Sequence, residues 1–232
     1  MIILPVTQGS DEWLQARLGL PTASRFDDIL TPKTMKPSTA SRKYIAELAA
    51  EWILGEPLES VNTDFMQRGT DLEKQAIAYY EIEHDVKTTE AGFVLRDDRL
   101  IGCSPDRLIG DDGGLEIKAP SAKKHMAYLL GIEELCPRGQ VQGGLWICER
   151  SYWDVMSFNP YMPPVLRRYG RDEEYLGKLE DAMIDFVARL AEAKERAREL
   201  GCVPLAEKLQ AELVKAALTA EAAERAIFGD VA

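Results

Sequence analysis

Residues 102–118 read GCSPDRLIGDDGGLEIK, in which two short apolar runs are separated by a turn rich in Asp and Gly. A turn of this composition between apolar runs is typical of a β-hairpin. Because consecutive side chains on a strand point to opposite faces, Glu116 and Lys118 are expected to share one face of the sheet. Asp106 precedes Glu116 by 10 positions, a separation that pairing across the turn can close. The segment therefore predicts two carboxylates and one ammonium group that converge at a sheet edge.

Two carboxylates on one rigid face suit Mg²⁺, a hard ion that takes oxygen ligands. The carbonyl of Ile117, between the two side chains, would supply a further oxygen. A metal there would activate a water and neutralise phosphate oxygens. We expect desolvation beside the metal to lower the pKa of Lys118, which would then orient or deprotonate the attacking water. The alternative is a surface ion pair between Glu116 and Lys118, which contributes only a few tenths of a kcal/mol.

The composition excludes several classes of protein. Hydrophobic residues make up 46% and charged residues 29% of the 232 positions, which excludes a wholly disordered or collagen-like chain. No apolar run approaches the ~18 residues of a membrane span, and the N-terminus has no basic leader. The four cysteines include no Cys-x-x-Cys pair. We therefore expect free thiols, no membrane segment and a cytoplasmic location.

The net charge of −11 argues against a non-specific binder of polyanions, which usually carries a basic excess. The charge is unevenly distributed, because residues 51–116 carry −10 while residues 1–50 and 117–168 carry +1 and +3. A nucleic-acid partner therefore stays possible if folding brings the basic stretches together. The acidic middle can be a solvated face, a cation site or both.

Apolar spacing along the rest of the chain predicts helices on both sides of a central sheet. Residues 31–39 predict a mobile basic loop, and the prolines of 160–164 predict the end of a strand. The fold class is α+β, with a mixed, mostly antiparallel sheet, which we expect to include an antiparallel meander. The expected helices cover 11–20, a short segment near Phe26, 40–54, 63–83, 121–131, 138–147, 173–200 and 205–228, and the expected strands cover 93–95, 100–103, 107–109, 114–118 and 151–159.

Asp106 followed by Glu116-Ile117-Lys118 resembles the PD-(D/E)xK nuclease core, and further blocks extend the resemblance. They are Trp13–Gly19, Thr22–Ser24, Arg68-Gly69 with Glu73, Cys103–Asp106, Leu115–Pro120 and Gln140–Gln142 with Trp146, in that order. In this order the chain is similar to the family of phage lambda exonuclease and the YqaJ-type viral recombinases over about residues 8–200. The resemblance implies a restriction-endonuclease-like core over residues 1–200. A helical extension over 201–232 lies beyond the match.

The family resemblance also implies roles for single residues. Asp106, Glu116, the Ile117 carbonyl and Glu73 would hold the metal, expected as two Mg²⁺ ions with Mn²⁺ as the alternative. Lys118 would act on the water, and Gln140 would line the active site. The structural alternatives are an exposed helix charge for Glu73 and a surface amide for Gln140.

A second set of residues matches the family's pocket for a 5′-phosphate, namely Arg17, Ser24 and Ser104. An Arg fork suits phosphate oxygens, and hydroxyl groups can donate to the remaining ones. The alternatives are a solvated helix arginine for Arg17 and a simple N-cap for Ser24. His84 and His125 match no block, so we expect no His-based catalysis.

The function that the resemblance implies is a Mg²⁺-dependent 5′→3′ exonuclease on double-stranded DNA ends. It would leave 3′ overhangs for phage-type recombination by strand annealing, as a ring-shaped homotrimer with a single-strand annealing protein as partner. The alternatives are an endonuclease on the same core, an inactive DNA-end-binding protein and an interaction scaffold. Residues 201–232 would pack on a neighbouring subunit, dock a partner or form a solvated helix. The candidates to line the ring are Lys33, Lys36, Arg42, Lys43, Lys123, Lys124 and Arg138.

Overall fold

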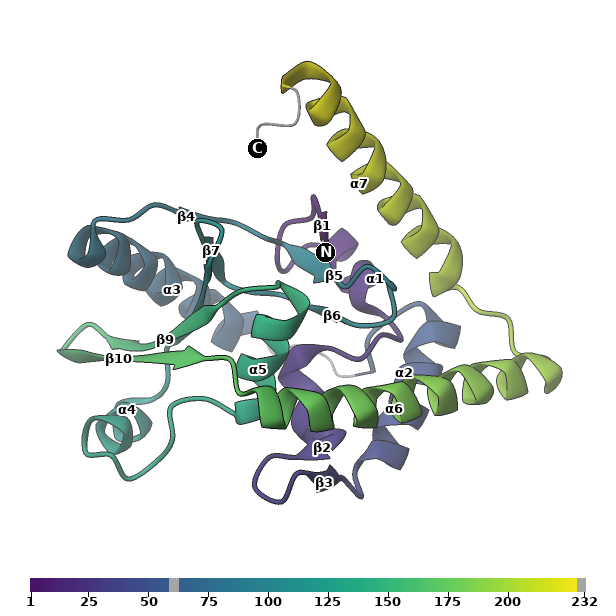
Figure 1. Ribbon diagram of the computed structural model, residues 1–232, viewed down its shortest axis with the longest axis horizontal. Helices are drawn as coiled ribbons and strands as arrows, with labels where there is room; N and C mark the ends of the chain where they lie inside the picture. The colour runs from purple at the N-terminus through teal and green to yellow at the C-terminus, as the bar shows by residue number, and fades with distance from the viewer. Residues whose placement is uncertain (59–62, 229–232) are drawn as a thin grey trace.

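A five-stranded mixed sheet forms the centre of the computed structural model, which describes residues 1–58 and 63–228 (Figure 1). Its strand order is β10-β9-β8-β7-β4, in which β8 and β9 run parallel and the other neighbours antiparallel. The predicted α+β fold with a mixed central sheet is confirmed. The strands are β4 (Thr88–Thr89), β7 (Arg107–Ile109), β8 (Gly113–Lys118), β9 (Tyr152–Asn159) and β10 (Met162–Gly170).

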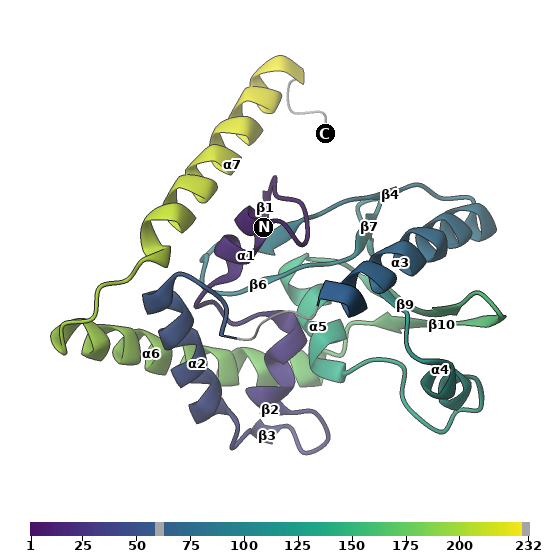
Figure 2. The same ribbon diagram turned by 180° about the vertical axis from the view of Figure 1, so that it is seen from behind.

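Helices cover both faces of this sheet, with α6 in front in Figure 1 and α3 in front in Figure 2. On the α3 face, Ile77 and Tyr80 pack against Leu115 and Ile117 of β8. On the opposite face, α5 and α6 pack on the alternate residues of β9, which include Trp153. The helices are α1 (Asp11–Arg17), α2 (Ser41–Leu54), α3 (Thr63–His84), α4 (Ala122–Leu129), α5 (Arg138–Ile147), α6 (Glu173–Glu199) and α7 (Ala206–Phe228), with a 3₁₀ helix, η1 (Ala23–Asp28).

Side chains next to the helices define several of the helix ends that the sequence predicts. The Oγ of Ser10 accepts the N–H of Trp13 at the start of α1, and Asp172 accepts the N–H of Tyr175 at the start of α6. Both contacts satisfy backbone donors that have no partner within the helix. Gly55 ends α2 in the left-handed region, with φ of 69°.

The expected antiparallel meander is wrong, because its strands belong to two sheets. β5 (Phe93–Leu95) and β6 (Gly102–Cys103) form a three-stranded sheet with β1 (Ile2–Leu4), whereas β7 and β8 belong to the five-stranded sheet. Pro105 lies between β6 and β7 and has no N–H to continue a ladder. The break leaves Asp106 at the point where the chain enters the larger sheet.

One further expectation about an irregular segment is wrong. Residues 31–39 contain part of a small antiparallel hairpin of β2 (Leu30–Thr31) and β3 (Lys36–Pro37). The strand expected over 151–159 ends before Pro160 as predicted, because β9 ends at Asn159. Pro163 and Pro164 lie within a further strand, β10, which the sequence analysis did not predict. β10 is an edge strand, and its pairing is irregular between Met162 and Val165. An edge strand with such an irregularity tolerates residues that lack an N–H.

The C-terminal helix α7 packs with its first half on the N-terminal part of the chain and then extends away from the body (Figure 1). Ala206 and Ala217 are buried, and Leu213 and Val214 pack on the cluster around Trp13. The expectation of a solvated terminal helix is therefore wrong for this half of α7. Among the described residues, no helix is long and apolar enough to cross a membrane.

Gly114 and Gly177 offer opposite tests of this packing. A Cβ on Gly114 would lie 2.3 Å from the Trp153 ring, so Gly114→Ala should lower the free energy of unfolding by about 1–3 kcal/mol. Nothing lies within 4 Å of a Cβ on the exposed, helical Gly177, so Gly177→Ala should raise it by about 0.5–1 kcal/mol. Urea denaturation measures both changes, and a Gly114→Ala protein as stable as wild type would contradict the described contact of β8 with β9.

Candidate active site

The carboxylates of Asp106 and Glu116 come together because β7 and β8 are neighbours. Their antiparallel register pairs Arg107 with Leu115, so one further step places Asp106 opposite Glu116. The backbone N–H of Ile117 donates a 2.5 Å hydrogen bond to Oδ2 of Asp106, which holds this carboxylate beside β8. Asp106 is half-buried and Glu116 is buried. The two carboxylates therefore meet as the hairpin predicts.

Lys118 and Gln140 complete a network around Glu116. The Lys118 Nζ and the Gln140 Nε2 each donate to Oε1 of Glu116 at 2.7 Å, and Nζ also donates to Oε1 of Gln140 at 3.2 Å. Gln140 reaches the site from the first turn of α5, so it is not a solvated surface amide. The Glu116–Lys118 pair is likewise not a surface ion pair, because Glu116 is only 7% exposed.

The electrostatics of this network follow from burial and like charge. Burial raises the pKa of Asp106 well above its usual range, and the negative charges of Glu116 and Glu73 raise it further. Burial alone would lower the pKa of Lys118, but the neighbouring Glu116 carboxylate outweighs that effect and raises it. This direction belongs to the arrangement without a metal. The lower pKa that the sequence analysis expects for Lys118 beside a bound metal stays a prediction.

Glu73 lies on α3 and lines a cavity of about 430 Å³ that Asp106 and Arg107 also line. Burial raises the pKa of Glu73. The positive charge of Arg107 lowers this pKa, and the negative charge of Glu116 raises it. Among the side chains that the structure describes, no three acidic, His or Cys residues form a group that could hold a metal. Glu73 shares its cavity with Asp106, and its negative charge acts on the pKa of Asp106. The side chain of Arg68, which precedes Glu73 in the resemblance, lies outside the described part.

The three residues expected to bind a 5′-phosphate gather in a second, smaller cavity. Arg17, Ser24 and Ser104 line a space of about 170 Å³, and so do Glu116 and Gln140. Arg17 ends α1, Ser24 lies in η1, and Ser104 follows β6. The structure therefore joins the phosphate candidates and the carboxylate network in one cavity.

Trp13 and Gln8 also shape this cavity. The sequence alone assigned neither of them a role in the site. The indole Nε1 of Trp13 donates to Ser104 Oγ at 2.8 Å, and the Arg17 guanidinium lies 4.3 Å from the centroid of the Trp13 ring. Gln8 donates to the carbonyl of Pro105 at 2.8 Å. Trp13 precedes Arg17 by four positions on a predicted helix, and this spacing was a signal that the two share a face.

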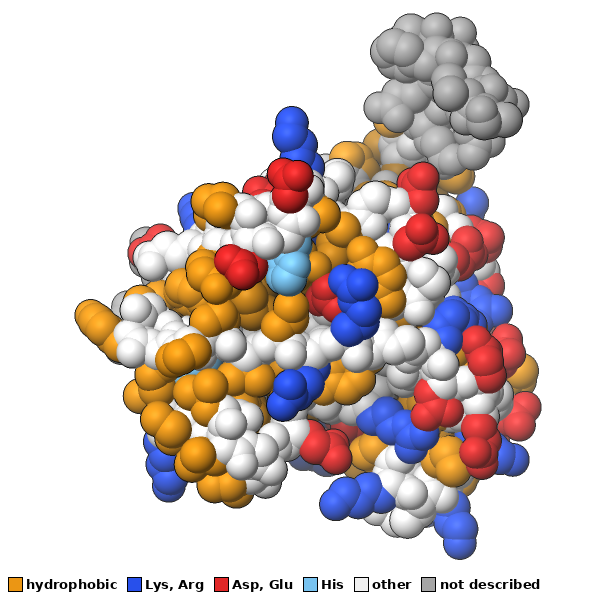
Figure 3. All heavy atoms as spheres, turned by 60° about the vertical axis from the view of Figure 1, so that its left-hand side comes forward, with side chains coloured by type: hydrophobic (Ala, Val, Ile, Leu, Met, Phe, Trp, Pro, Cys, Tyr) orange, Lys and Arg blue, Asp and Glu red, His pale blue; other side chains and the backbone are white. Residues whose placement is uncertain are grey.

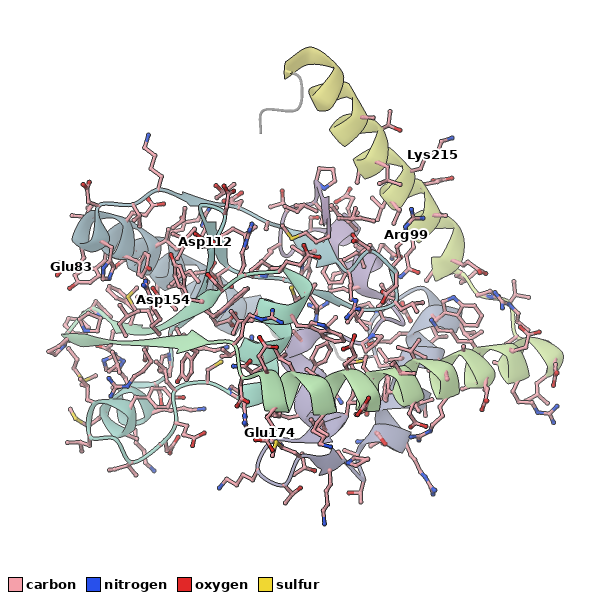
Figure 4. All side chains as sticks on the ribbon, viewed as in Figure 1. Glu83, Arg99, Asp112, Asp154, Glu174 and Lys215 are labelled. Atoms are coloured by element: carbon pink, nitrogen blue, oxygen red, sulfur yellow. The ribbon has the colours of Figure 1, made fainter. Side chains whose placement is uncertain are left out.

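Two other buried polar side chains, Asp154 and His125, are satisfied within the scaffold. Asp154 is 1% exposed and accepts two 2.8 Å hydrogen bonds from Arg168 and one of 2.5 Å from Tyr80. Figure 4 shows Asp154 beside α3, far from Arg99 and Lys215 near α7. His125 is hydrogen-bonded to Ser157 and to a backbone carbonyl, and connects α4 to the sheet. These contacts explain the groups without a catalytic role.

The basic residues proposed to line a ring differ in their surroundings. Arg138 pairs with Asp172 and lies over the ring of Tyr175, so it stabilises the contact between α5 and α6. In Figure 3, acidic and basic side chains are scattered among apolar ones over the end of the molecule that lies at the left in Figure 1. The remaining candidates are exposed to solvent, namely Lys33, Lys36, Arg42, Lys43, Lys123 and Lys124.

A mixed sheet that carries Asp106, Glu116 and Lys118 on adjacent strands is the arrangement expected of a PD-(D/E)xK nuclease core. Residues 12–151 match the YqaJ-like viral recombinase domain, and the chain belongs to this family. Its fold is similar to the alkaline exonuclease LHK-Exo from Laribacter hongkongensis in two crystal structures, one of them in complex with dAMP. The identities are 30% and 32% and the TM-score is 0.71 in both, over 83% of this chain and 98% of that chain.

A phage-related exonuclease from Haemophilus somnus 129PT shares the fold, with a TM-score of 0.53 and 14% identity over 85% of this chain and 97% of that chain. Comparison with curated proteins finds no match. The chain is thus a homologue of phage-type alkaline exonucleases.

The repulsion between the carboxylates predicts a stability effect in metal-free protein. Asp106→Asn removes one negative charge but keeps an oxygen that accepts the N–H of Ile117. It should therefore raise the free energy of unfolding in EDTA by about 0.5–2 kcal/mol, the usual gain from removing an unfavourable charge interaction. Thermal unfolding measures the change. The exposed Asp111→Asn is the control and should have little effect, and a destabilised Asp106→Asn protein would contradict the described repulsion.

Proposed function

We propose that the protein is a Mg²⁺-dependent 5′→3′ exonuclease that degrades one strand from double-stranded DNA ends and leaves 3′ overhangs. The observation that carries this proposal is the cavity that joins Glu116 and Gln140 to Arg17, Ser24 and Ser104. A site that holds a terminal phosphate beside a hydrolytic network would cleave next to a 5′ end. Repeated cleavage there would proceed in the 5′→3′ direction.

The donor set fits a hard divalent cation. Among the described residues, no donor bonds to Oδ1 of Asp106 or Oε2 of Glu116, so each carboxylate keeps one oxygen for a ligand. We propose that these two carboxylates and the Ile117 carbonyl hold Mg²⁺, and that Glu73 contributes to a second ion. When bound, Mg²⁺ supplies activation of the water and neutralisation of phosphate oxygens.

The chain's own residues position the reacting groups. We propose that Lys118 orients the attacking water and offsets negative charge that develops on the phosphate. Gln140 holds Lys118 and Glu116 in their relative positions through hydrogen bonds to both. The N–H of Ile117 holds the Asp106 carboxylate toward β8.

Arg17 supports the recognition of a phosphorylated end. Among the described side chains, no carboxylate forms an ion pair with Arg17, whose guanidinium stacks on Trp13 and lines the cavity where an external anion would bind. A terminal phosphate carries about −1.5 to −2 charges near pH 7, more than the single charge of an internal phosphodiester. We therefore propose that Arg17, Ser24 and Ser104 select a 5′-phosphate. The dAMP bound to the homologue LHK-Exo is itself a nucleotide that carries a phosphate.

The proposed activity is tested on linear duplexes with a 5′-phosphate or a 5′-hydroxyl and on closed circular DNA, with Mg²⁺ or EDTA. We expect fast release of nucleotides from the 5′-phosphorylated duplex with Mg²⁺ alone. Lys118→Ala should lower the rate by about 10²–10³-fold, the range for loss of a group that stabilises negative charge in the transition state. Lys178→Ala, at an exposed lysine of α6, is the matched control and should not change it.

Cleavage of the closed circle would instead indicate an endonuclease. Binding to DNA ends without hydrolysis in the wild-type protein would indicate an end-binding protein, and either result would contradict the proposal.

We further propose that three copies form a ring around the duplex and act with a single-strand annealing protein in phage-type recombination. Exposed apolar side chains at one end of the molecule support an interface between copies, because large apolar patches mark association surfaces. Met126, Leu130 and Ile132 lie on and after α4, and Tyr161 lies between β9 and β10; their exposed fractions are 42%, 66%, 71% and 93%.

Light scattering on the purified protein measures the oligomeric state. We expect the mass of three chains for wild type, and a shift toward monomer for Ile132→Asp because a charge would be buried in the interface. Ile184→Asp, at an equally exposed position of α6, is the control and should keep the trimer. A monomeric wild-type protein at micromolar concentration would contradict the ring.

A further inference from the structure

Two side chains from the C-terminal helices hold the end of α1. Gln210 of α7 donates from Nε2 to the carbonyl of Leu18 at 2.6 Å and to that of Gln15 at 3.2 Å. Lys194 of α6 donates from Nζ to the carbonyl of Gly19 at 2.9 Å. The last carbonyls of a helix have no partner within the helix. Here their donors come from residues more than 170 positions away.

The turn that receives these hydrogen bonds is tightly packed. Gly19 has φ of +66°, and a Cβ there would lie 2.6 Å from Cβ of Trp52 and 3.0 Å from the carbonyl oxygen of Leu48. Leu18, Trp52 and Ala206 form one buried cluster, and Lys194 lies 5.2 Å from the centroid of the Trp52 ring. The end of α1 is therefore held between α2, α6 and the start of α7.

The same turn carries Arg17 into the cavity. Arg17 lies between the anchored carbonyls of Gln15 and Leu18, and its guanidinium stacks on Trp13, which donates to Ser104. A shift of this backbone would move the guanidinium relative to Ser104. Neither Gln210 nor Lys194 lines that cavity or contacts Asp106, Glu116, Lys118 or Gln140.

We propose that Gln210 and Lys194 are positioning residues that set the preference for a 5′-phosphorylated end by fixing the place of Arg17, an inference that rests on the proposed exonuclease function. Both residues lie outside residues 12–151, the part that matches the family domain. The C-terminal helices would then contribute to end selection without touching the DNA. A displacement of about 1 Å at a positioning group can cost about 10²-fold in rate.

The variants are Gln210→Glu, which keeps the shape but cannot donate, and Lys194→Met, which loses the donor. Lys194→Arg is the conservative variant, and Glu212→Ala, at an exposed position of α7, is the matched control. Each full-length protein is assayed with Mg²⁺ on linear duplexes that carry a 5′-phosphate or a 5′-hydroxyl, over a range of DNA concentrations. Hydrogen exchange of the backbone amides of residues 14–22, measured without DNA, shows how firmly Gln210 and Lys194 hold the end of α1.

We expect the ratio of kcat/KM for 5′-phosphorylated over 5′-hydroxyl ends to fall at least tenfold in Gln210→Glu and Lys194→Met. Activity on 5′-hydroxyl ends should stay within twofold of wild type. The ratio for Lys194→Arg should lie close to that of the wild-type protein, and the ratio for Glu212→Ala should equal it. Exchange in residues 14–22 should become faster in the two disrupting variants.

An unchanged ratio in both disrupting variants would overturn the proposal. An equal loss of activity on both ends would also overturn it, because a merely structural role has that effect. If wild type itself shows no preference for a 5′-phosphate, the phosphate pocket of the proposed function fails and this inference fails with it. The exchange data then still show whether Gln210 and Lys194 anchor α1, so the two failures are distinguishable.

Discussion

The candidate site depends on holding two negative carboxylates side by side where little water reaches them. Their repulsion and burial raise the pKa of Asp106. The backbone pairing of β7 with β8 overcomes this cost, because it positions Asp106 opposite Glu116 whatever their charges. Lys118, Gln140 and the N–H of Ile117 then supply the compensating donors. The divalent cation that we propose for this site would replace part of this compensation.

The layers around the sheet separate the apolar and polar sides of β8. α3 covers Leu115 and Ile117, while α5 covers the face of Glu116 and brings Gln140 to it. α1 joins the site from outside the five-stranded sheet through Trp13 and Ser104. Helices α6 and α7 support α1 in turn. Recognition of the DNA end and hydrolysis would therefore take place on separate parts of the scaffold that meet in one cavity.

Much of the fold could be predicted because local signals agree with each other. Ser10 begins α1, and the alternation of β8 places Glu116 beside Lys118. The second half of the β9–β10 hairpin was missed, because prolines argue against a strand unless its place at an edge is known. The pKa of Lys118 beside a metal stays a prediction. Without a metal, the Glu116 carboxylate raises this pKa more than burial lowers it, and only the tertiary structure shows both effects.

The amino-acid sequence by itself determined the hairpin, the helix starts and the pairing of Asp106 with Glu116. These features depend on hydrogen bonds and side-chain alternation within about ten residues of chain. Only the tertiary structure decided that Gln140 reaches Glu116, that Trp13 reaches Ser104 and that Gln210 caps α1. Such contacts join distant segments through the packing of whole helices on sheets. Their geometry follows from how all the buried side chains fill space together, and no local pattern encodes that.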